Sequence, residues 1–586
     1  VNLCCVLILR NAFESAEAAA RKAIEIDSRS AKAWSSLAVA QCGLKNPEAA
    51  ETAACAAIEL DPVSSEAWVN LCDALCMQRR YEPAESAARK AIDLEPESSI
   101  AWRKLGQVLV ELKRHKDAAD CFAKSLAFDP LAEAVLGEMV YSRMQICDWG
   151  NFSADLEAMT GQFSRIKSVS GVTPFLILAL TTDLAVHLQV SKLYAAGQSF
   201  ERFHLGAIPK LPRHDRIRIG YYSADFHNHA TAYLMAELFE LHDKNKFELV
   251  GFSFGPDFQD DMRQRVSAAF EQFIDVRDRS DREIALLSRE LGIDIAIDLK
   301  GYTQDCRPGI FACRAAPVQV SYLGFPGTMG VGFMDYIIAD RTLIPLGSQS
   351  CYSEKVVYLP NSYQVNDTKR DISPRIFTRE ELGLPASGFV FACFNNSYKI
   401  TPPTFAGWMR ILSRVEDSVL WLFEANPDAV GNLRKEAASQ GIDPCRLVFA
   451  KQLPLPDHLA RIRMADLFLD TLPYNAHTTT SDALWAGLPV LTCPGESFAS
   501  RVAASLLNAM ALPELIADSP EAYENRAVEL AGDPVQLGAI RRKLAENRNT
   551  APLFDSRLFA RHIEAAFVSM YERYQANLPP EHIYVE

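Results

Sequence analysis

The sequence has no long hydrophobic run, although 49% of its 586 residues are hydrophobic. A helix that crosses a bilayer needs about 20 consecutive apolar residues, so we expect no membrane-spanning segment and no membrane partner. The first residues, VNLCCVLILR, are apolar, but they lack a basic segment and a cleavage site. The sequence therefore predicts no signal peptide.

Paired cysteine motifs are also missing. The 14 cysteines are scattered without CxxC pairs and without the cysteine and histidine spacing of zinc sites. This pattern is typical of reduced thiols, and we expect a cytoplasmic protein.

An excess of basic residues is absent as well, because 60 Lys and Arg stand against 74 Asp and Glu, for a net charge of −14. Nucleic-acid binding needs a basic face, so we expect no such partner.

No GxGxxG follows the first predicted strand, which weighs against NAD or FAD as cofactor. No DxD pair lies in a loop of the first α/β region, so a divalent metal is not indicated.

What the sequence does have is a repeat with a period of 34 residues in its first part. Four sets of positions keep this period: Trp34, Trp68 and Trp102; Leu3, Leu37, Leu71 and Leu105; Ile24, Ile58, Ile92 and Leu126; Ala19, Ala53, Ala87 and Cys121. A 34-residue unit of two amphipathic helices resembles the tetratricopeptide repeat. Such units bury a core only by stacking, so we expect an α-solenoid with a concave face over residues 1–130, in which these positions pack.

The register places residue 1 inside a repeat, so we expect a truncated first repeat with more repeats before it. The period fades after Asp129. Residues 146–149 read as a closing helix, and the segment that follows reads as further helices. We therefore predict a helical cap and bridge over residues 131–211.

From Arg216 onward, strands alternate with helices, which predicts two successive halves with parallel sheets of the Rossmann type. The first half, residues 212–380, has an expected strand that runs into a loop at 216–226, further expected strands at 247–254, 293–299 and 318–323, and expected helices at 232–241, 259–270 and 281–291. The second half, residues 381–586, has expected strands at 389–396, 418–424, 446–450, 467–469 and 489–495 and expected helices at 403–414, 427–440, 456–464 and 499–509. A long chain of this kind holds several domains.

The strongest local signal for a binding site lies in the second half, in the stretch DLFLDTLPYNAHTTTSDALWAGLP at 466–489. A buried strand runs into a loop, and His477, Thr478 and Thr479 then stand where a helix begins. Free N–H groups at such a helix start bind phosphate, His477 can donate to a phosphate oxygen, and Asp482 one turn later can accept from a sugar hydroxyl. The alternative is an ordinary N-capped helix with surface threonines.

The loop after the first strand of the first half carries Asp225, His227, His229 and Thr231. Ligands of open α/β sheets bind at the carboxyl ends of strands, so a histidine there could be a general base or could hold a sugar hydroxyl. The alternative is a histidine that caps the next helix. A second loop, residues 323–330, is rich in glycine and could let the backbone approach a ligand closely.

Long motifs of both halves resemble the O-GlcNAc transferases of glycosyltransferase family 41. They are FNNSYKI (394–400), LPDHLARIRMADLFLD (455–470), YNAHTTTSDALWAG (474–487), PGESFASRVAAS (494–505), SADFHNHATAYLM (223–235), GYT (301–303) and YLGFPGTMG (322–330). The resemblance covers nearly the whole chain and is closest to the compact bacterial-type members with tetratricopeptide repeats in front. It implies a two-lobed α/β glycosyltransferase of the B type, whose second lobe binds the donor nucleotide.

The resemblance also implies roles for residues at the donor phosphates and at the reacting atoms. Lys399 matches the lysine that contacts the donor diphosphate, where an ammonium would offset charge on departing UDP. Asn396 stands where animal members have Gln at the phosphates, and Tyr398 lines the same site. His229 matches the histidine long proposed as catalytic base, with Asp225 four positions before it. The donor's own phosphate oxygen is a rival base.

The remaining donor contacts are implied in the same way. His477, Thr478 and Thr479 match the phosphate-binding HTT motif, and Asp482 matches the aspartate that holds the ribose. The other expected donor contacts, which include residues around the uracil and a backbone segment that meets the base, are Leu453, Leu455, His458, Arg461 and Thr231. Leu455 is a departure, because animal members have Lys at this ribose contact.

The resemblance thus implies an inverting, metal-independent enzyme without a cofactor. It would transfer GlcNAc from UDP-GlcNAc to Ser or Thr hydroxyls of intracellular proteins held by the repeat groove. Plant members that use GDP-fucose have a Gly in place of His477 and lack the DHLAR pattern, so this chain favours a UDP-sugar. The alternatives are a protein O-fucosyltransferase, the same fold with a non-protein acceptor, and a repeat scaffold with an inactive transferase lobe.

Overall fold

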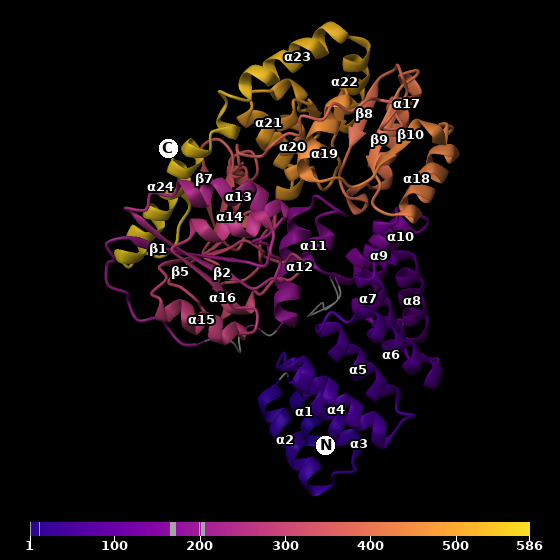
Figure 1. Ribbon diagram of the computed structural model, residues 1–586, viewed down its shortest axis with the longest axis vertical. Coiled ribbons are helices and arrows are strands. Elements are labelled where there is room, and N and C mark those ends of the chain that lie inside the picture. The colour runs from indigo at the N-terminus through magenta and orange to yellow at the C-terminus, as the bar shows by residue number, and fades with distance from the viewer. Residues whose placement is uncertain (1, 11, 164–171, 199, 201–204) are drawn as a thin grey trace. The chain divides into compact units, whose positions relative to one another are not determined.

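The computed structural model describes residues 2–10, 12–163, 172–198, 200 and 205–586. The chain divides into two compact units (Figure 1). The first unit is Val1–Ile146 with Asn151–Asp155, and the second is Cys147–Gly150 with Leu156–Glu586. Among the described residues, no helix combines the length and the apolar character that a membrane crossing needs.

The first unit is a stack of antiparallel helix pairs, as the 34-residue period predicts. Its helices are α1 (Asn2–Leu9), α2 (Phe13–Ile26), α3 (Ala31–Gly43), α4 (Pro47–Leu60), α5 (Ser65–Met77), α6 (Tyr81–Leu94), α7 (Ser99–Glu111), α8 (His115–Phe128) and α9 (Glu133–Gln145). The repeated tryptophans are half-buried, and each indole N–H donates to a backbone carbonyl six residues earlier, at 3.1 Å for Trp34, 3.1 Å for Trp68 and 2.8 Å for Trp102. The predicted solenoid is confirmed, and the tryptophans are packing residues.

The predicted closing helix at residues 146–149 is wrong. Helix α9 ends at Gln145, and the chain turns at Cys147, whose φ is +52°. A left-handed residue interrupts the helical hydrogen bonds, so the apolar pattern of this segment reflects burial and not helix. Three helices follow, α10 (Phe152–Phe163), α11 (Pro174–Ile177) and α12 (Leu184–Gly197).

The first lobe is built on an eight-stranded parallel sheet of order β13-β7-β6-β5-β4-β1-β2-β3. Its elements up to residue 359 are β1 (Ile217–Ser223), α13 (Ala230–Leu241), β2 (Phe247–Ser253), α14 (Asp261–Ala269), β3 (Gln272–Asp275), α15 (Asp281–Glu290), β4 (Ile295–Asp298), α16 (Gly309–Ala312), β5 (Val318–Ser321), β6 (Tyr336–Asp340), η2 (Leu346–Cys351) and β7 (Lys355–Leu359). Strands β4 and β5 are buried along their whole length, as expected of a sheet covered on both faces.

The second lobe has a five-stranded parallel sheet of order β10-β9-β8-β11-β12. Its elements are β8 (Val390–Cys393), η3 (Ser397–Lys399), α17 (Pro402–Arg414), β9 (Val419–Phe423), α18 (Pro427–Ser439), η4 (Pro444–Arg446), β10 (Leu447–Ala450), α19 (Leu455–Arg461), η5 (Ile462–Met464), β11 (Leu467–Leu469), α20 (Thr478–Ala486), β12 (Val490–Leu491), η6 (Phe498–Ser500), α21 (Val502–Ala509), η7 (Pro513–Leu515), α22 (Pro520–Gly532), α23 (Pro534–Asn547) and η8 (Pro552–Phe554). The predicted two-lobed α/β fold is therefore confirmed.

The last elements return to the first lobe. Helix α24 (Ser556–Gln575) contacts α13 and β7, and β13 (Ile583–Tyr584) pairs in parallel with β7 (Figure 1). The expected second lobe, residues 381–586, therefore includes a strand that completes the sheet of the first, because the open edge of β7 offers hydrogen-bonding groups that β13 satisfies. The other predicted domain bounds stay predictions.

Each sheet has one point at which the strand order reverses. In the first sheet the reversal lies between β1 and β4, and in the second it lies between β8 and β11. Ligands of open α/β sheets bind outside the carboxyl ends of the strands at such points. The fold thus directs attention to the loops after β1, β4, β8 and β11.

Candidate active site

The two loops at the reversal point of the second sheet are joined through Lys399. Lys399 ends η3, after β8, and its Nζ donates to the backbone carbonyl of Asn475 at 2.9 Å, after β11. The ammonium also lies 3.8 Å from the centre of the Tyr474 ring. Burial lowers the pKa of Lys399 to about 8, against the opposing effect of Asp470. A cation is therefore held at the strand ends with donor capacity left for a ligand.

Asp470 lies beneath this loop and is fully buried. Its carboxylate accepts from the N–H groups of Thr471 and Ala476, at 2.7 and 2.6 Å, and from the Thr492 hydroxyl at 2.6 Å. Burial raises the pKa of Asp470 to about 7. This carboxylate fixes the loop that carries the Asn475 carbonyl, and sequence reasoning did not identify it.

The N-terminus of α20 faces the same region. The first intrahelical bond runs from Ser481 N to His477 O, so the N–H groups of residues 478–480 have no partner inside the helix. The Thr479 hydroxyl donates to Asn395 Oδ1 at 2.5 Å, and Asn395 in turn donates to Thr471 at 2.8 Å. Backbone N–H groups, and not the Thr479 hydroxyl, are therefore the donors that this helix start offers to an anion.

His477 caps α20 by position and lies 3.0 Å, through Nε2, from the Ala499 carbonyl. A carbonyl only accepts, so Nε2 carries the proton of the neutral ring. Burial lowers the pKa of His477 well below its usual value. The expected donation from His477 to a phosphate would require a second ring proton, which this environment disfavours.

Helix α19 brings His458 and Arg461 together, as the sequence anticipated. Arg461 is buried and donates to His458 Nδ1 at 3.2 and 3.1 Å. His458 meets the Phe394 ring edge-on at 5.2 Å. Burial lowers the pKa of His458 to about 4, so the ring is neutral and its proton sits on Nε2. That N–H can donate to a carbonyl of a planar base.

The remaining expected donor contacts lie around these groups. Asn396 is exposed and caps η3, and Tyr398 packs between the rings of Phe175 and Tyr474, at 5.7 and 6.2 Å. Leu453 and Leu455 are half-buried at the start of α19. Asp482 is buried in α20, where Oδ1 accepts from Arg370 Nη1 at 2.6 Å. Arg370 was not anticipated, because 112 residues separate it from its partner.

The first lobe holds a second cluster, at its own reversal point. Lys300, after β4, donates to Asp225 Oδ2 at 2.6 Å, after β1. The same Asp225 oxygen lies 3.5 Å from His229 Nδ1. Both Asp225 and Lys300 are buried, whereas the His229 side chain is 42% exposed. The pairing of Lys300 with Asp225 was not predicted from the sequence.

His229 is the N-cap of α13, which agrees with the alternative of a histidine that caps the next helix. Its Nδ1 accepts from the N–H of Thr231 at 3.2 Å, so the proton of the neutral ring lies on Nε2. Burial lowers the pKa of His229. In this geometry the exposed side of the ring offers a hydrogen-bond donor. A general base would need the accepting nitrogen to face the substrate. Thr231 itself is buried in α13.

The glycine-rich loop at residues 323–330 serves packing. A Cβ at Gly324 would lie 2.0 Å from the Leu299 carbonyl, and one at Gly330, whose φ is +67°, would lie 2.7 Å from Lys192 N. Gly324 and Gly330 therefore allow close packing against the residue after β4 and against α12, and the approach of this loop to a ligand stays a prediction. Among the described residues, no group of three or more metal-ligating side chains gathers. The assignment of individual residues to the donor stays a prediction.

Comparison with known proteins places this geometry in a family. Residues 207–376 and 368–563 match glycosyl transferase family 41, and residues 41–99 and 73–133 match the tetratricopeptide repeat. The mutant O-GlcNAc transferase structure of Thermobaculum terrenum superposes with a TM-score of 0.69 and 26% identity, over 94% of this chain and 99% of that one.

Two curated relatives are named as peptide N-acetylglucosaminyltransferases that use UDP-N-acetylglucosamine. The Arabidopsis thaliana protein, named as a probable one, is 35% identical over 76% of this chain and 48% of its own length. The Caenorhabditis elegans protein is 28% identical over 75% of this chain and 49% of its own length. The chain thus spans about half the length of the curated relatives it matches.

Proposed function

The chain belongs to glycosyltransferase family 41, and we propose that it transfers GlcNAc from UDP-GlcNAc to Ser or Thr hydroxyls of proteins. The observation that carries the proposal is the buried Lys399 ammonium on the Asn475 carbonyl, in the same loop system as the free N–H groups of α20. A cation and a helix N-terminus at one strand end form a site for a leaving diphosphate. The names of the relatives support GlcNAc as the transferred sugar. His458 and Arg461 of α19 support uracil as the nucleobase of the donor.

The proposed reaction is a single displacement with inversion. The acceptor oxygen forms a bond to the anomeric carbon while the bond from that carbon to the β-phosphate oxygen breaks. Lys399 and the start of α20 stabilise the charge that UDP gains as it leaves. The acceptor proton needs a base. Because His229 Nδ1 already accepts from Thr231, we assign this proton to a phosphate oxygen of the donor.

No metal and no cofactor enter this proposal. The charge that a divalent cation would neutralise is met by Lys399 and by backbone N–H groups. We further propose that the repeats hold the acceptor proteins, because a solenoid of this kind presents a long concave face. Fourteen unpaired cysteines support acceptors in a reducing compartment, the cytoplasm.

The test is GlcNAc transfer to proteins in EDTA, read by mass spectrometry, with UDP-GlcNAc or GDP-fucose as donor. We expect modified Ser and Thr residues with UDP-GlcNAc only. The Lys399→Met variant should keep the fold by circular dichroism and lose at least 100-fold in rate. Transfer from GDP-fucose alone would move the chain to fucosyl transfer, and absence of binding by any nucleotide in calorimetry would favour an inactive scaffold.

A further inference from the structure

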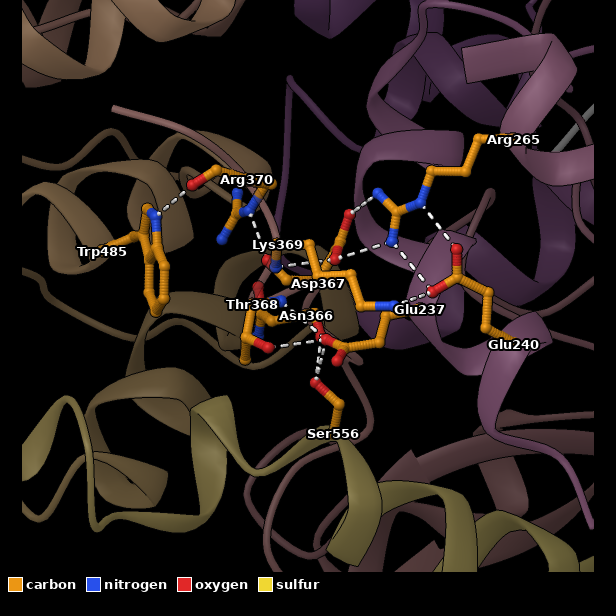
Figure 2. Close-up of polar contacts among 10 residues, drawn as sticks. All are labelled: Glu237, Glu240, Arg265, Asn366, Asp367, Thr368, Lys369, Arg370, Trp485 and Ser556. Atoms are coloured by element: carbon orange, nitrogen blue, oxygen red, sulfur yellow. Dashed lines mark hydrogen bonds and ion pairs between the residues drawn. The ribbon is translucent and has the colours of Figure 1, made fainter. Parts of the chain in front are cut away.

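A short linking segment, residues 366–370 (NDTKR), connects the first lobe to the second (Figure 2). It follows β7 and precedes β8. Asn366 and Arg370 reach elements of the second lobe, whereas the three residues between them reach helices of the first. The segment is therefore a polar bridge between α13, the helix that His229 caps, and α20, the helix expected to hold the donor.

The first-lobe side of the bridge consists of charge-assisted contacts. Asp367 is fully buried and pairs with Arg265 of α14 at 2.5 and 3.1 Å. The Thr368 N–H and hydroxyl both donate to Glu237 of α13 at 2.8 Å. Lys369 donates to Glu240 of α13 at 2.5 Å. Figure 2 shows these side chains converging on the segment from the α13 and α14 side. The backbone of the segment is thus fixed relative to the first lobe.

The second-lobe side ends on Arg370. Its Nη1 donates to Asp482 Oδ1 at 2.6 Å, and its Nη2 donates to the Ser481 hydroxyl at 3.3 Å. The guanidinium is held in turn, because its Nε donates to the Asp367 carbonyl at 3.0 Å and Trp485 donates to the Arg370 carbonyl at 3.2 Å. The Arg370 side chain is only 2% exposed. Burial and these hydrogen bonds hold the guanidinium where it meets Asp482.

The ion pair uses only one carboxylate oxygen. Arginine commonly donates to both oxygens of a carboxylate, but here the second terminal nitrogen of Arg370, Nη2, donates to the Ser481 hydroxyl. Among the described residues, none hydrogen-bonds Asp482 Oδ2. That oxygen is also not among the buried polar atoms left without a partner, and the Asp482 side chain is 10% exposed. Oδ2 is therefore oriented and open to a ligand.

We propose that Arg370 is a positioning residue of the donor site, which aims the free oxygen of Asp482 at the ribose hydroxyls of the nucleotide. The inference rests on the proposed function, because it takes a uridine nucleotide as the ligand. It adds a residue that sequence reasoning did not identify, and it makes ribose recognition depend on the linking segment.

The electrostatics agree with this assignment. Burial raises the pKa of Asp482, and Arg370 opposes that effect. Without the guanidinium, the carboxyl group would be desolvated without a counter-charge and would gain a proton more readily. A protonated group accepts hydrogen bonds from a diol far less well than a carboxylate does. Arg370 thus orients Asp482 and favours its charged form.

The test compares UDP with 2′-deoxy-UDP and 3′-deoxy-UDP by calorimetry on the full chain. We expect the unmodified protein to bind UDP about tenfold or more tightly than at least one deoxy analogue, since a hydrogen bond to a charged group is lost. In Arg370→Met this discrimination should fall to less than threefold. Arg370→Lys, which retains a cation, should keep an intermediate preference, and it carries the test if Arg370→Met does not fold.

Two controls separate positioning from stability. Arg410 pairs bidentately with Glu524 between α17 and α22 and is largely exposed, so Arg410→Met should leave the discrimination unchanged. In an Asp482→Asn background, Arg370→Met should cause no further loss of discrimination, as expected of a coupled pair.

Distinct results overturn distinct claims. If Arg370→Met binds UDP more weakly but keeps the full preference over both analogues, Arg370 is only structural. If the unmodified protein binds UDP and both deoxy analogues equally, Asp482 does not read the ribose, and the proposed function stands without this inference. If the unmodified protein binds no UDP at all, the proposed function fails and the inference fails with it.

Discussion

At the scale of single residues, Lys399 is held between two opposing effects. Burial disfavours its charge, whereas Asp470 favours it. Its backbone acceptor, Asn475 O, belongs to a loop that Asp470 itself fixes through two N–H groups. The ability of Lys399 to stabilise a leaving diphosphate therefore depends on a second residue that does not touch the ligand.

The pKa of about 8 at Lys399 gives a pH dependence. Only the protonated amine stabilises the leaving group, so kcat/KM for UDP-GlcNAc should fall as the pH rises through about 8. Steady-state rates between pH 6 and 10 test this. In Lys399→Arg, any residual activity should persist to pH 10, because a guanidinium stays charged. A wild-type profile that is flat to pH 10 would rule out this role.

Asp470→Asn should move the basic limb of that profile to lower pH, by about one unit. The substitution keeps the shape of the side chain, and its oxygen can still accept from Thr471 and Ala476, but it removes the charge that supports the Lys399 cation. The same pH profile measures the effect, with circular dichroism as the check on folding. A limb that stays in place would show that the two groups do not interact.

At the scale of elements, helix α13 begins with a residue that has two candidate roles. His229 caps the helix by accepting from Thr231 N, and its exposed side offers an N–H. We expect His229→Ala to lose about 0.5–2 kcal/mol of stability, because the N–H of Thr231 loses its partner.

His229→Asn should restore that stability, since asparagine is a good N-cap, but it should not restore transfer to the wild-type rate. Thermal melts and transfer assays on the same three proteins separate the roles. Full recovery of transfer in His229→Asn would make the cap the whole function of this residue.

Elements whose sequence signals are local could be predicted from the sequence alone. The 34-residue period, the apolar strand at 467–469 and the helix that ends at Gly487, whose φ is +90°, all lie where the pattern placed them. Each depends on neighbours within one repeat or one turn. Long family motifs added the order of the two lobes.

Contacts over long sequence separations could not be predicted. Asp482 carries no local sign of Arg370, and Asp225 carries none of Lys300, because both pairs form only when segments from distant parts of the chain become neighbours. The contacts of His477 and Thr479 could not be predicted for the same reason, since their partners, Ala499 and Asn395, come from other loops.

At the scale of the whole molecule, two compact units predict two unfolding events. We expect calorimetry of the full chain to resolve two transitions, one for the repeats and one for the transferase unit, because separate cores unfold separately. UDP at 100 times its Kd should raise only the second, by about 2.7 kcal/mol of stabilisation.

The control for this prediction is GDP at the same concentration, which should move neither transition. A single transition that UDP shifts as a whole would mean that the two units unfold as one cooperative body, contrary to the division of contacts along the chain.

The strand β13 has a consequence for synthesis of the protein. The sheet of the first lobe starts at Ile217, yet its outermost strand is residues 583–584. A ribosome adds about 5–20 residues per second, so the nascent first lobe waits, with the edge of β7 unpaired, while the entire second lobe is translated. An unpaired edge invites pairing with other chains. Newly made molecules are thus exposed to edge pairing with other chains throughout translation of the second lobe, until the final strand emerges.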